Sequence, residues 1–186
     1  MDRRLFIAVP LPPDVKRSIK NLYIPQLRNS SFRSLVHPDD YHITLFFLGA
    51  TSEHASISIG QALRETAKTS PPFELSVDGT GTFGKPGSPS ILWAGVNGEV
   101  DRLRSLQKAV AEQVSRIGFT PEERAYSPHI SLARKWTSNE PYGGHIKGQD
   151  KPMHFEVTRI VLYQTHLNRK PSYEEVESYP LSSASS

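Results

Sequence analysis

The stretch HITLFFLG, residues 42–49, places one ionisable side chain at the head of an otherwise apolar run. Such a run is typical of a buried β-strand, and a histidine entering it costs desolvation free energy unless it is paired or meets solvent. Alternate side chains of a strand share a face, so His42 and Thr44 point away from Ile43. His42 is therefore either a strand-edge residue or part of a site.

A second copy of this pattern occurs at HISL, residues 129–132. The apolar stretch LFIAV begins 37 residues before the first motif (42 − 5), and LWAGV begins 37 residues before the second (129 − 92). An amphipathic segment lies between the two stretches in each half. This internal repeat predicts two lobes related by a pseudo-twofold axis, with the motif strands facing each other across a central cleft.

The rest of the pattern predicts an α+β fold: a bilobal molecule with two pseudo-twofold-related antiparallel sheets and outer helices. The expected strands cover residues 5–9, 42–49, 73–77, 91–96, 155–167 and 173–177, with another from residue 129. The expected helices begin near Pro13, Ser52 and residue 100, and Pro25 should kink or end the first. The stretch GTGTFGKPGSPS, residues 79–90, reads as a loop too long for a tight hairpin.

Composition narrows the function classes. The 186 residues include 22 Lys and Arg against 19 Asp and Glu, and the net charge of +3 permits an anionic partner without requiring one. Cysteine is absent, which excludes disulfides, thiolate nucleophiles and cysteine-bound zinc. No apolar stretch approaches the ~20 residues of a membrane span. We expect a cytoplasmic monomer with no membrane contact, one bilobal domain over residues 1–180 and a disordered tail over 181–186.

The two motifs together would set two imidazoles and two hydroxyls, those of Thr44 and Ser131, around one cleft. An imidazole can act as acid or base near neutral pH, so one of His42 and His129 could activate water while the other protonates a leaving oxygen. Hydroxyls can stabilise the charge that builds on the non-bridging oxygens. The pattern therefore favours in-line cleavage of a phosphodiester without metal or cofactor, and the chemistry alone does not say which histidine is the acid.

Other interpretations are weaker. A single H-x-[ST] carries little information, because His54-Ala55-Ser56 matches it in a polar helix start. A metal site is the main rival chemistry, but there is no H-E-x-x-H and no close cluster of ligands, so we expect no metal. The stretch GTGTFG lacks the following helix of a nucleotide-binding loop and predicts a turn.

The stretches RLFIAVPLP, HITLFFLG, GTFGKPGSPSILWAGV, HISLAR and FEVTRIVLYQTHL resemble the RNA 2′,3′-cyclic phosphodiesterases, also called 2′-5′ RNA ligases, of the two-histidine phosphoesterase superfamily. The resemblance implies that His42 is the general acid and His129 the general base, opening a 2′,3′-cyclic phosphate to a 2′-phosphate. It implies phosphate binding by Thr44 and Ser131, RNA as the partner, and a reversible ligation by the same groups. Ser131 keeps the hydroxyl of the threonine found in many relatives.

Two further residues are candidates for substrate contact. Arg134 lies five residues after His129, which places it on the opposite face unless the strand bulges. Phe46 shares the face of His42 by alternation and would border the base-binding end of the cleft, although an aromatic in such a run is more often core. His37 stands where relatives often have an aromatic residue before the proline, so the resemblance implies no stacking role at this position.

Three functions remain open from the sequence. The first is hydrolysis of RNA 2′,3′-cyclic phosphate ends. The second keeps the site and changes the substrate to a small cyclic nucleotide or to the cyclic phosphate formed in tRNA splicing. The third is an RNA-end-binding module without catalysis, which the mild excess of positive charge would suit.

Overall fold

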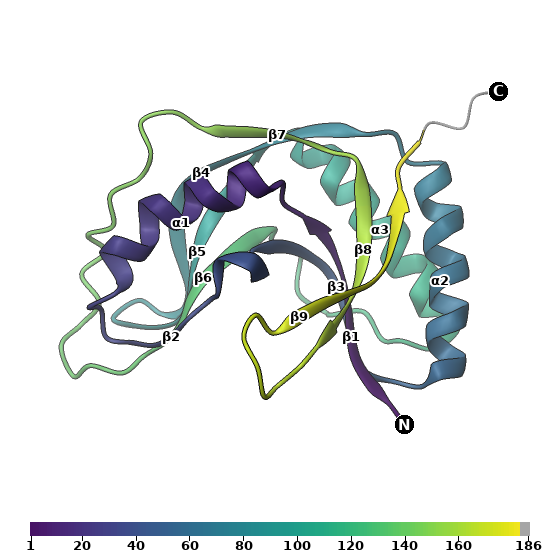
Figure 1. Ribbon diagram of the computed structural model, residues 1–186, viewed down its shortest axis with the longest axis horizontal. Helices are drawn as coiled ribbons and strands as arrows, with labels where there is room; N and C mark the ends of the chain where they lie inside the picture. Colours follow the sequence, from purple (N-terminus) through teal and green to yellow (C-terminus); the bar gives the residue numbers. More distant parts are fainter. Residues whose placement is uncertain (183–186) are drawn as a thin grey trace.

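A computed structural model describes residues 1–182 as two antiparallel sheets with three α-helices (Figure 1). The elements are β1 (Arg3–Pro10), α1 (Pro13–Leu27), β2 (Phe32–Leu35), the 3-10 turn η1 (Pro38–Asp40), β3 (His42–Thr51), α2 (Glu53–Lys68), β4 (Phe73–Lys85), β5 (Ser88–Gly98), α3 (Val100–Ile117), β6 (His129–Trp136), β7 (Met153–Val157), β8 (Arg159–Thr165) and β9 (Tyr173–Pro180). The strand order is β3-β1-β8-β9 in the first sheet and β2-β6-β5-β4-β7 in the second. The expected α+β, two-sheet architecture is confirmed.

Each half contains a strand, a helix and a motif strand: β1, α1 and β3 in the first, β5, α3 and β6 in the second. The helices are exchanged between the halves. α1 follows a strand of the first sheet but packs against β7 of the second, while α3 follows a strand of the second sheet and packs against β3 and α2. Figure 1 shows α2 and α3 at one end of the molecule and α1 at the other. One hydrophobic core therefore spans both lobes.

The repeat differs in detail from its expected spacing. In the first half Ala8 pairs with Thr44, 36 positions apart (44 − 8), whereas in the second half Trp93 pairs with Ser131, 38 positions apart (131 − 93). The equal 37-residue spacing therefore does not mark equivalent positions. The similarity of LFIAV to LWAGV reflects the apolar composition of two central strands, because both are covered on the core face.

The glycine-rich stretch 79–90 is not a loop. It forms the end of a long β4–β5 hairpin in which Lys85 pairs with Ser88. The pairing register shifts after Val77 and again at Gly84, and Gly79 and Gly84 have φ of +75° and +93°. Glycines adopt these left-handed angles without strain, so Gly79 and Gly84 mark irregularities within the paired strands. The turn itself consists of the two residues between Lys85 and Ser88.

Other boundaries also differ from expectation. α1 continues two residues past Pro25, and β2 has no counterpart among the expected strands. The expected strand over 155–167 is two strands that pair in different sheets, β7 with β4 and β8 with β1. Leu181 is buried and its N–H bonds to the Thr158 carbonyl, so the packed chain extends beyond residue 180. Residues 183–186 of the expected tail lie outside the described residues.

Candidate functional site

His42 opens β3 in a buried position, with 9% of its surface exposed. Its Nδ1 lies 2.7 Å from the Asp40 carbonyl oxygen and its Nε2 lies 2.8 Å from Thr44 Oγ1. A carbonyl can only accept, so Nδ1 carries the ring proton, and in the neutral ring Nε2 accepts the hydroxyl proton of Thr44. The imidazole is thus held in one tautomer with Nε2 turned toward the hydroxyl of its own motif.

His129 opens β6 in the same way. Its Nδ1 donates to the Ser127 carbonyl oxygen at 2.8 Å, again the residue two positions earlier. The side chain is half-buried, and Nε2 makes no hydrogen bond to any residue in the range 1–182. β3 and β6 are in contact at the junction of the two sheets. The motif strands therefore present two imidazoles, each with Nε2 as its reactive nitrogen.

Both motif strands bulge at the leucine of the motif. Thr44 and Phe46 pair with adjacent residues of β1, which leaves Leu45 without a partner, and Leu132 is left out in the same way between β5 and β6. The carbonyl oxygen of each bulged leucine accepts a hydrogen bond from a residue outside the strand pair that bulges. Gln107 of α3 donates to the Leu45 oxygen at 3.3 Å, and the Val36 N–H donates to the Leu132 oxygen at 2.9 Å.

A one-residue bulge reverses the alternation of side chains beyond it. The position five residues after each histidine therefore shares the histidine's face. In β6 this position is Arg134, and its positive charge acts on both His129 and His42. The structure thus places Arg134 on the face of the histidines. The sequence predicted this position only if the strand contained a bulge.

The corresponding residue of β3 is Phe47, not Phe46. Phe46 is 7% exposed and pairs with Ile7 within the core, so its expected place beside His42 is wrong. Phe47 is 65% exposed, and its ring lies 5.7 Å from that of Phe6, which in turn lies 5.0 Å from the His42 ring. Simple alternation assigns Phe47 to the core, and no residue of HITLFFLG signals the bulge that overturns this assignment.

Aromatic rings that sequence reasoning left out surround both imidazoles. Tyr173 meets the His42 ring edge-on at 5.2 Å, and Tyr163 lies 6.2 Å from it. On the other side, Phe83 meets the His129 ring edge-on at 4.7 Å. These rings come from β4, β8 and β9, so only the folded sheets bring them to the motifs.

The pKa of His42 is lowered from 6.5 to about 4, chiefly because burial disfavours its charged form. The positive charges of Arg134 and Lys16 act in the same direction, as does His129 when it is protonated, against the bond from Nδ1 to the Asp40 carbonyl. The pKa of His129 is also lowered, first by burial and then by Arg134, against its own carbonyl bond. Both rings are therefore neutral at pH 7 in the free protein.

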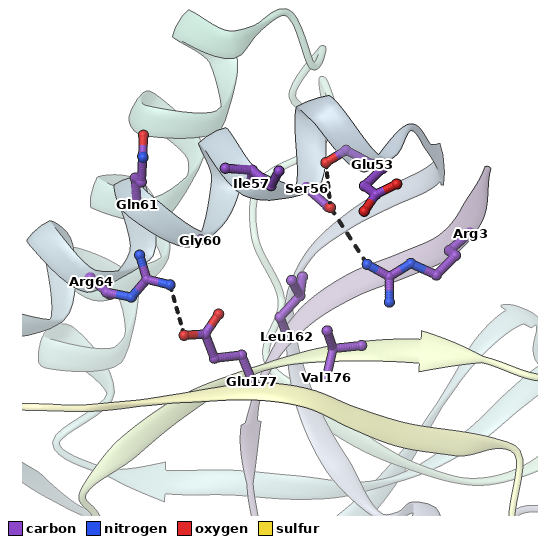
Figure 2. Close-up of a pocket in the computed structure, with 10 residues that line it drawn as sticks. All are labelled: Arg3, Glu53, Ser56, Ile57, Gly60, Gln61, Arg64, Leu162, Val176 and Glu177. Atoms are coloured by element: carbon purple, nitrogen blue, oxygen red, sulfur yellow. Dashed lines mark hydrogen bonds and ion pairs between the residues drawn. The ribbon is translucent and has the colours of Figure 1, made fainter. Parts of the chain in front are cut away.

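A separate hollow lies on the outer side of the first sheet, between α2 and β9 (Figure 2). The Arg64–Glu177 ion pair, 2.8 Å long, crosses it, and Arg3 approaches Ser56 Oγ at 3.5 Å. None of its lining residues belongs to the histidine motifs. Within residues 1–182 no three His, Cys, Asp or Glu side chains are grouped as metal ligands, and no helix is long and apolar enough to span a membrane.

Comparisons with known proteins agree with this architecture. The model of the 2′-5′ RNA ligase superfamily matches residues 12–169. An RNA 2′,3′-cyclic phosphodiesterase of Geobacillus stearothermophilus is 36% identical over 178 residues, which cover 95% of this chain and 56% of the relative. One of Bacillus subtilis is also 36% identical, over 182 residues that cover 95% of this chain and 96% of the relative.

Among solved structures, the crystal structure of E. coli LigT complexed with 3′-AMP is similar with a TM-score of 0.82. The two chains are 24% identical, and the match covers 97% of this chain and 99% of that one, so the likeness concerns the fold. The family expected from the motifs is confirmed by the match over residues 12–169 and by the two relatives. The chain belongs to the 2′-5′ RNA ligase superfamily.

Proposed function

We propose that this chain hydrolyses 2′,3′-cyclic phosphate ends of RNA to 2′-phosphates, with His42 and His129 as the acid–base pair and without a metal ion. Water adds to phosphorus, the bond from phosphorus to the 3′ oxygen breaks, and that oxygen leaves as a hydroxyl. The observation that carries the proposal is the pair of tethered imidazoles on β3 and β6. Relatives over 95% of the chain are named for this activity, which supports the substrate class.

His129 suits the general base. Its Nδ1 proton is bound to the Ser127 carbonyl, and its Nε2 lone pair has no partner among the described residues. A neutral imidazole with a free lone pair can take a proton from water as the water adds to phosphorus. The lowered pKa of His129 keeps the ring in this neutral form at pH 7.

His42 suits the general acid once substrate is bound. At a pKa of about 4 the free protein holds it neutral, with Nε2 accepting from Thr44. A phosphodiester anion near Arg134 offsets the positive charge and raises the pKa of His42. Protonation turns Nε2 into a donor, which can protonate the 3′ oxygen and release the Thr44 hydroxyl to a phosphate oxygen. The catalytic proton is therefore taken up together with substrate.

The remaining groups complete the site in this proposal. Arg134 and the hydroxyls of Thr44 and Ser131 donate to the non-bridging phosphate oxygens, where charge builds in the transition state. The exposed ring of Phe47 offers a stacking face for a nucleobase. The same acid–base pair can run in reverse, joining a cyclic phosphate to a 5′-hydroxyl.

The test uses an oligonucleotide that ends in a 2′,3′-cyclic phosphate, incubated with the wild-type chain in EDTA. We expect a 2′-phosphate, identified by ³¹P NMR against 2′- and 3′-phosphate standards. A 3′-phosphate, or turnover only after metal is added, would contradict the proposal. Binding without product would favour the RNA-end-binding function, and preferred turnover of a cyclic mononucleotide would favour a small-molecule substrate.

A further inference from the structure

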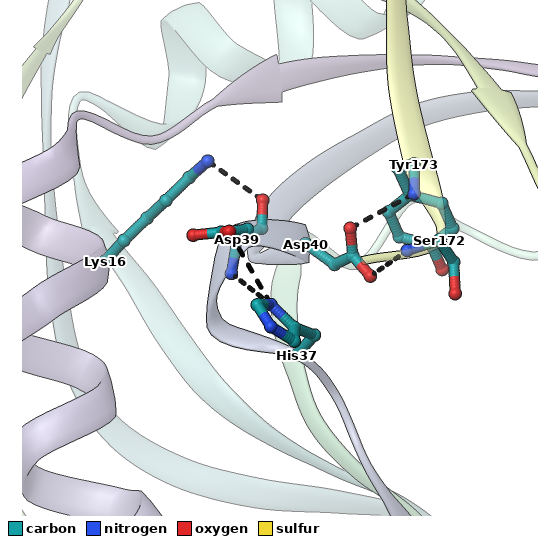
Figure 3. Close-up of polar contacts among 6 residues, drawn as sticks. All are labelled: Lys16, His37, Asp39, Asp40, Ser172 and Tyr173. Carbon is teal, nitrogen blue, oxygen red and sulfur yellow. Dashed lines mark hydrogen bonds and ion pairs between the residues drawn. The ribbon is translucent and has the colours of Figure 1, made fainter. Parts of the chain in front are cut away.

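Asp40 is a buried carboxylate next to the His42 motif, with 5% of its surface exposed. It ends the turn η1, two residues before His42. One carboxylate oxygen accepts the Ser172 N–H at 2.7 Å and the other accepts the Tyr173 N–H at 3.1 Å (Figure 3). Both bonds span more than 130 positions of sequence, so the side chain joins the segment before β3 to the start of β9.

The backbone of the same residue holds the catalytic ring. The Asp40 carbonyl oxygen accepts the His42 Nδ1 proton at 2.7 Å, and Tyr173 packs its ring edge-on against the His42 ring at 5.2 Å. Asp40, His42 and Tyr173 therefore form a closed circuit of contacts. The Asp40 carbonyl binds the imidazole at Nδ1, and the Tyr173 ring packs against it. The Asp40 carboxylate in turn binds the Tyr173 N–H, which links the two groups that hold the ring.

The turn around Asp40 is fixed on its other side as well. The Asp40 N–H donates to the His37 carbonyl at 2.8 Å, and Lys16 of α1 donates to the Asp39 carbonyl at 3.0 Å. Figure 3 shows Lys16 on one side of the turn, Ser172 and Tyr173 on the other, and His37 below it. The Asp40 carboxylate is the part of this arrangement that reaches β9.

We propose that Asp40 is a positioning residue for His42: its carboxylate fixes the start of β9 to the turn, so that the Asp40 carbonyl and the Tyr173 ring together set the orientation of the imidazole. The inference deepens the proposed function and rests on it for its kinetic readout. A shift of about 1 Å in a catalytic group can lower turnover by about 100-fold while leaving substrate contacts in place. Loss of the carboxylate should therefore act on kcat more than on KM.

The test compares Asp40→Ala and Asp40→Asn with Asp39→Ala and Asp39→Asn, matched changes at the exposed neighbour in the same turn. We expect Asp40→Ala to lower kcat on the cyclic-phosphate oligonucleotide by about 10- to 100-fold with KM within about threefold. Asp40→Asn keeps the shape and one acceptor, so its kcat should lie between those of the wild type and Asp40→Ala. The Asp39 variants should match the wild type. Circular dichroism at the assay temperature establishes that each variant is folded.

A spectroscopic readout separates positioning from general loss of structure. In ¹⁵N-detected NMR of the imidazole nitrogens, Asp40→Asn should move the His42 resonances and leave those of His129 unchanged. Wild-type kcat in a folded Asp40→Asn variant, or equal changes at both histidines, would overturn the inference. If the wild type does not open the cyclic phosphate, the proposed function fails, while the NMR comparison still decides whether Asp40 positions His42.

Discussion

β3 and β6 carry the same motif, the same bond from Nδ1 to the carbonyl two residues earlier and the same one-residue bulge, yet they surround their histidines differently. The β3 histidine is buried among aromatic rings and its lone pair accepts from Thr44. The β6 histidine is half-buried, and its Nε2 has no hydrogen-bond partner among residues 1–182. Its strand contributes an arginine where β3 contributes a phenylalanine.

In the mechanism proposed above, this difference lets a duplicated motif serve two roles. The shared parts fix the tautomer and the direction of each ring, because they are local features of strand and turn. The unshared parts set burial and charge, which decide how easily each ring takes a proton. In the proposed mechanism, the acid and base roles are therefore set by neighbours that lie outside the motif.

Removing either histidine ring should have the largest effect on activity. His42→Gln and His129→Gln should each lower kcat/KM on a cyclic-phosphate oligonucleotide by about 10²- to 10⁴-fold, because each removes one proton-transfer group. Steady-state kinetics of the two single variants and the double variant provides the measurement. The double variant should be little worse than either single one, since the groups act as a unit. Wild-type activity in either single variant would remove that histidine from the mechanism.

Acid titration of stability should distinguish the two rings. His42 has a pKa of about 4 when folded and 6.5 when unfolded, so the unfolded chain binds more protons as pH falls from 6.5 to 4. Folding stability is then present above pH 6.5 and lost toward pH 4, by about 3 kcal/mol from this ring. Urea unfolding of His42→Gln should show a flatter pH dependence than the wild type. The same change at His129 should flatten it less, and equal flattening would contradict the difference in burial.

The features that sequence could reveal are local ones. The paired motifs, the strand–helix–strand order and the amphipathic α3 follow from periodicity, and together they predict both the two-sheet fold and the family. The bulges at Leu45 and Leu132 do not follow, because a bulge depends on partners such as Gln107 that are distant in sequence. Alternation alone therefore misplaces Phe46 and leaves Arg134 undecided.

The glycine-rich hairpin illustrates the same limit. Glycines at 79, 81, 84 and 87 indicate a loop by composition, whereas pairing with β5 holds most of them in a bulged strand. Gly81 faces the Trp93 ring so closely that a Cβ atom would overlap it. Close approach of a ring to the backbone is a tertiary requirement, and composition cannot separate it from a loop.

A substitution at Arg134 tests how its positive charge acts on His42 and on His129. Arg134→Gln should raise the pKa of His42 and of His129, since a nearby positive charge that disfavours protonation is removed. It should also lower kcat/KM by about 10- to 100-fold through loss of a charged donor to phosphate. NMR titration of the histidines and steady-state kinetics measure the two effects. Lys135→Gln, the exposed neighbour, is the control, and an unchanged pKa at both rings would place Arg134 outside the site.

Phe47 offers the smallest and most selective test, because it occupies in β3 the place that Arg134 occupies in β6. Phe47 is 65% exposed, so Phe47→Ala should change the free energy of unfolding by no more than about 0.5 kcal/mol. Loss of base stacking, about 1 kcal/mol at the low end, should raise KM for an oligonucleotide about fivefold and leave kcat unchanged. Phe47→Trp should keep the wild-type KM. A cyclic phosphate without an adjoining nucleobase should not distinguish the variants, whereas equal KM changes for both substrates would show that the ring acts on the phosphate site instead.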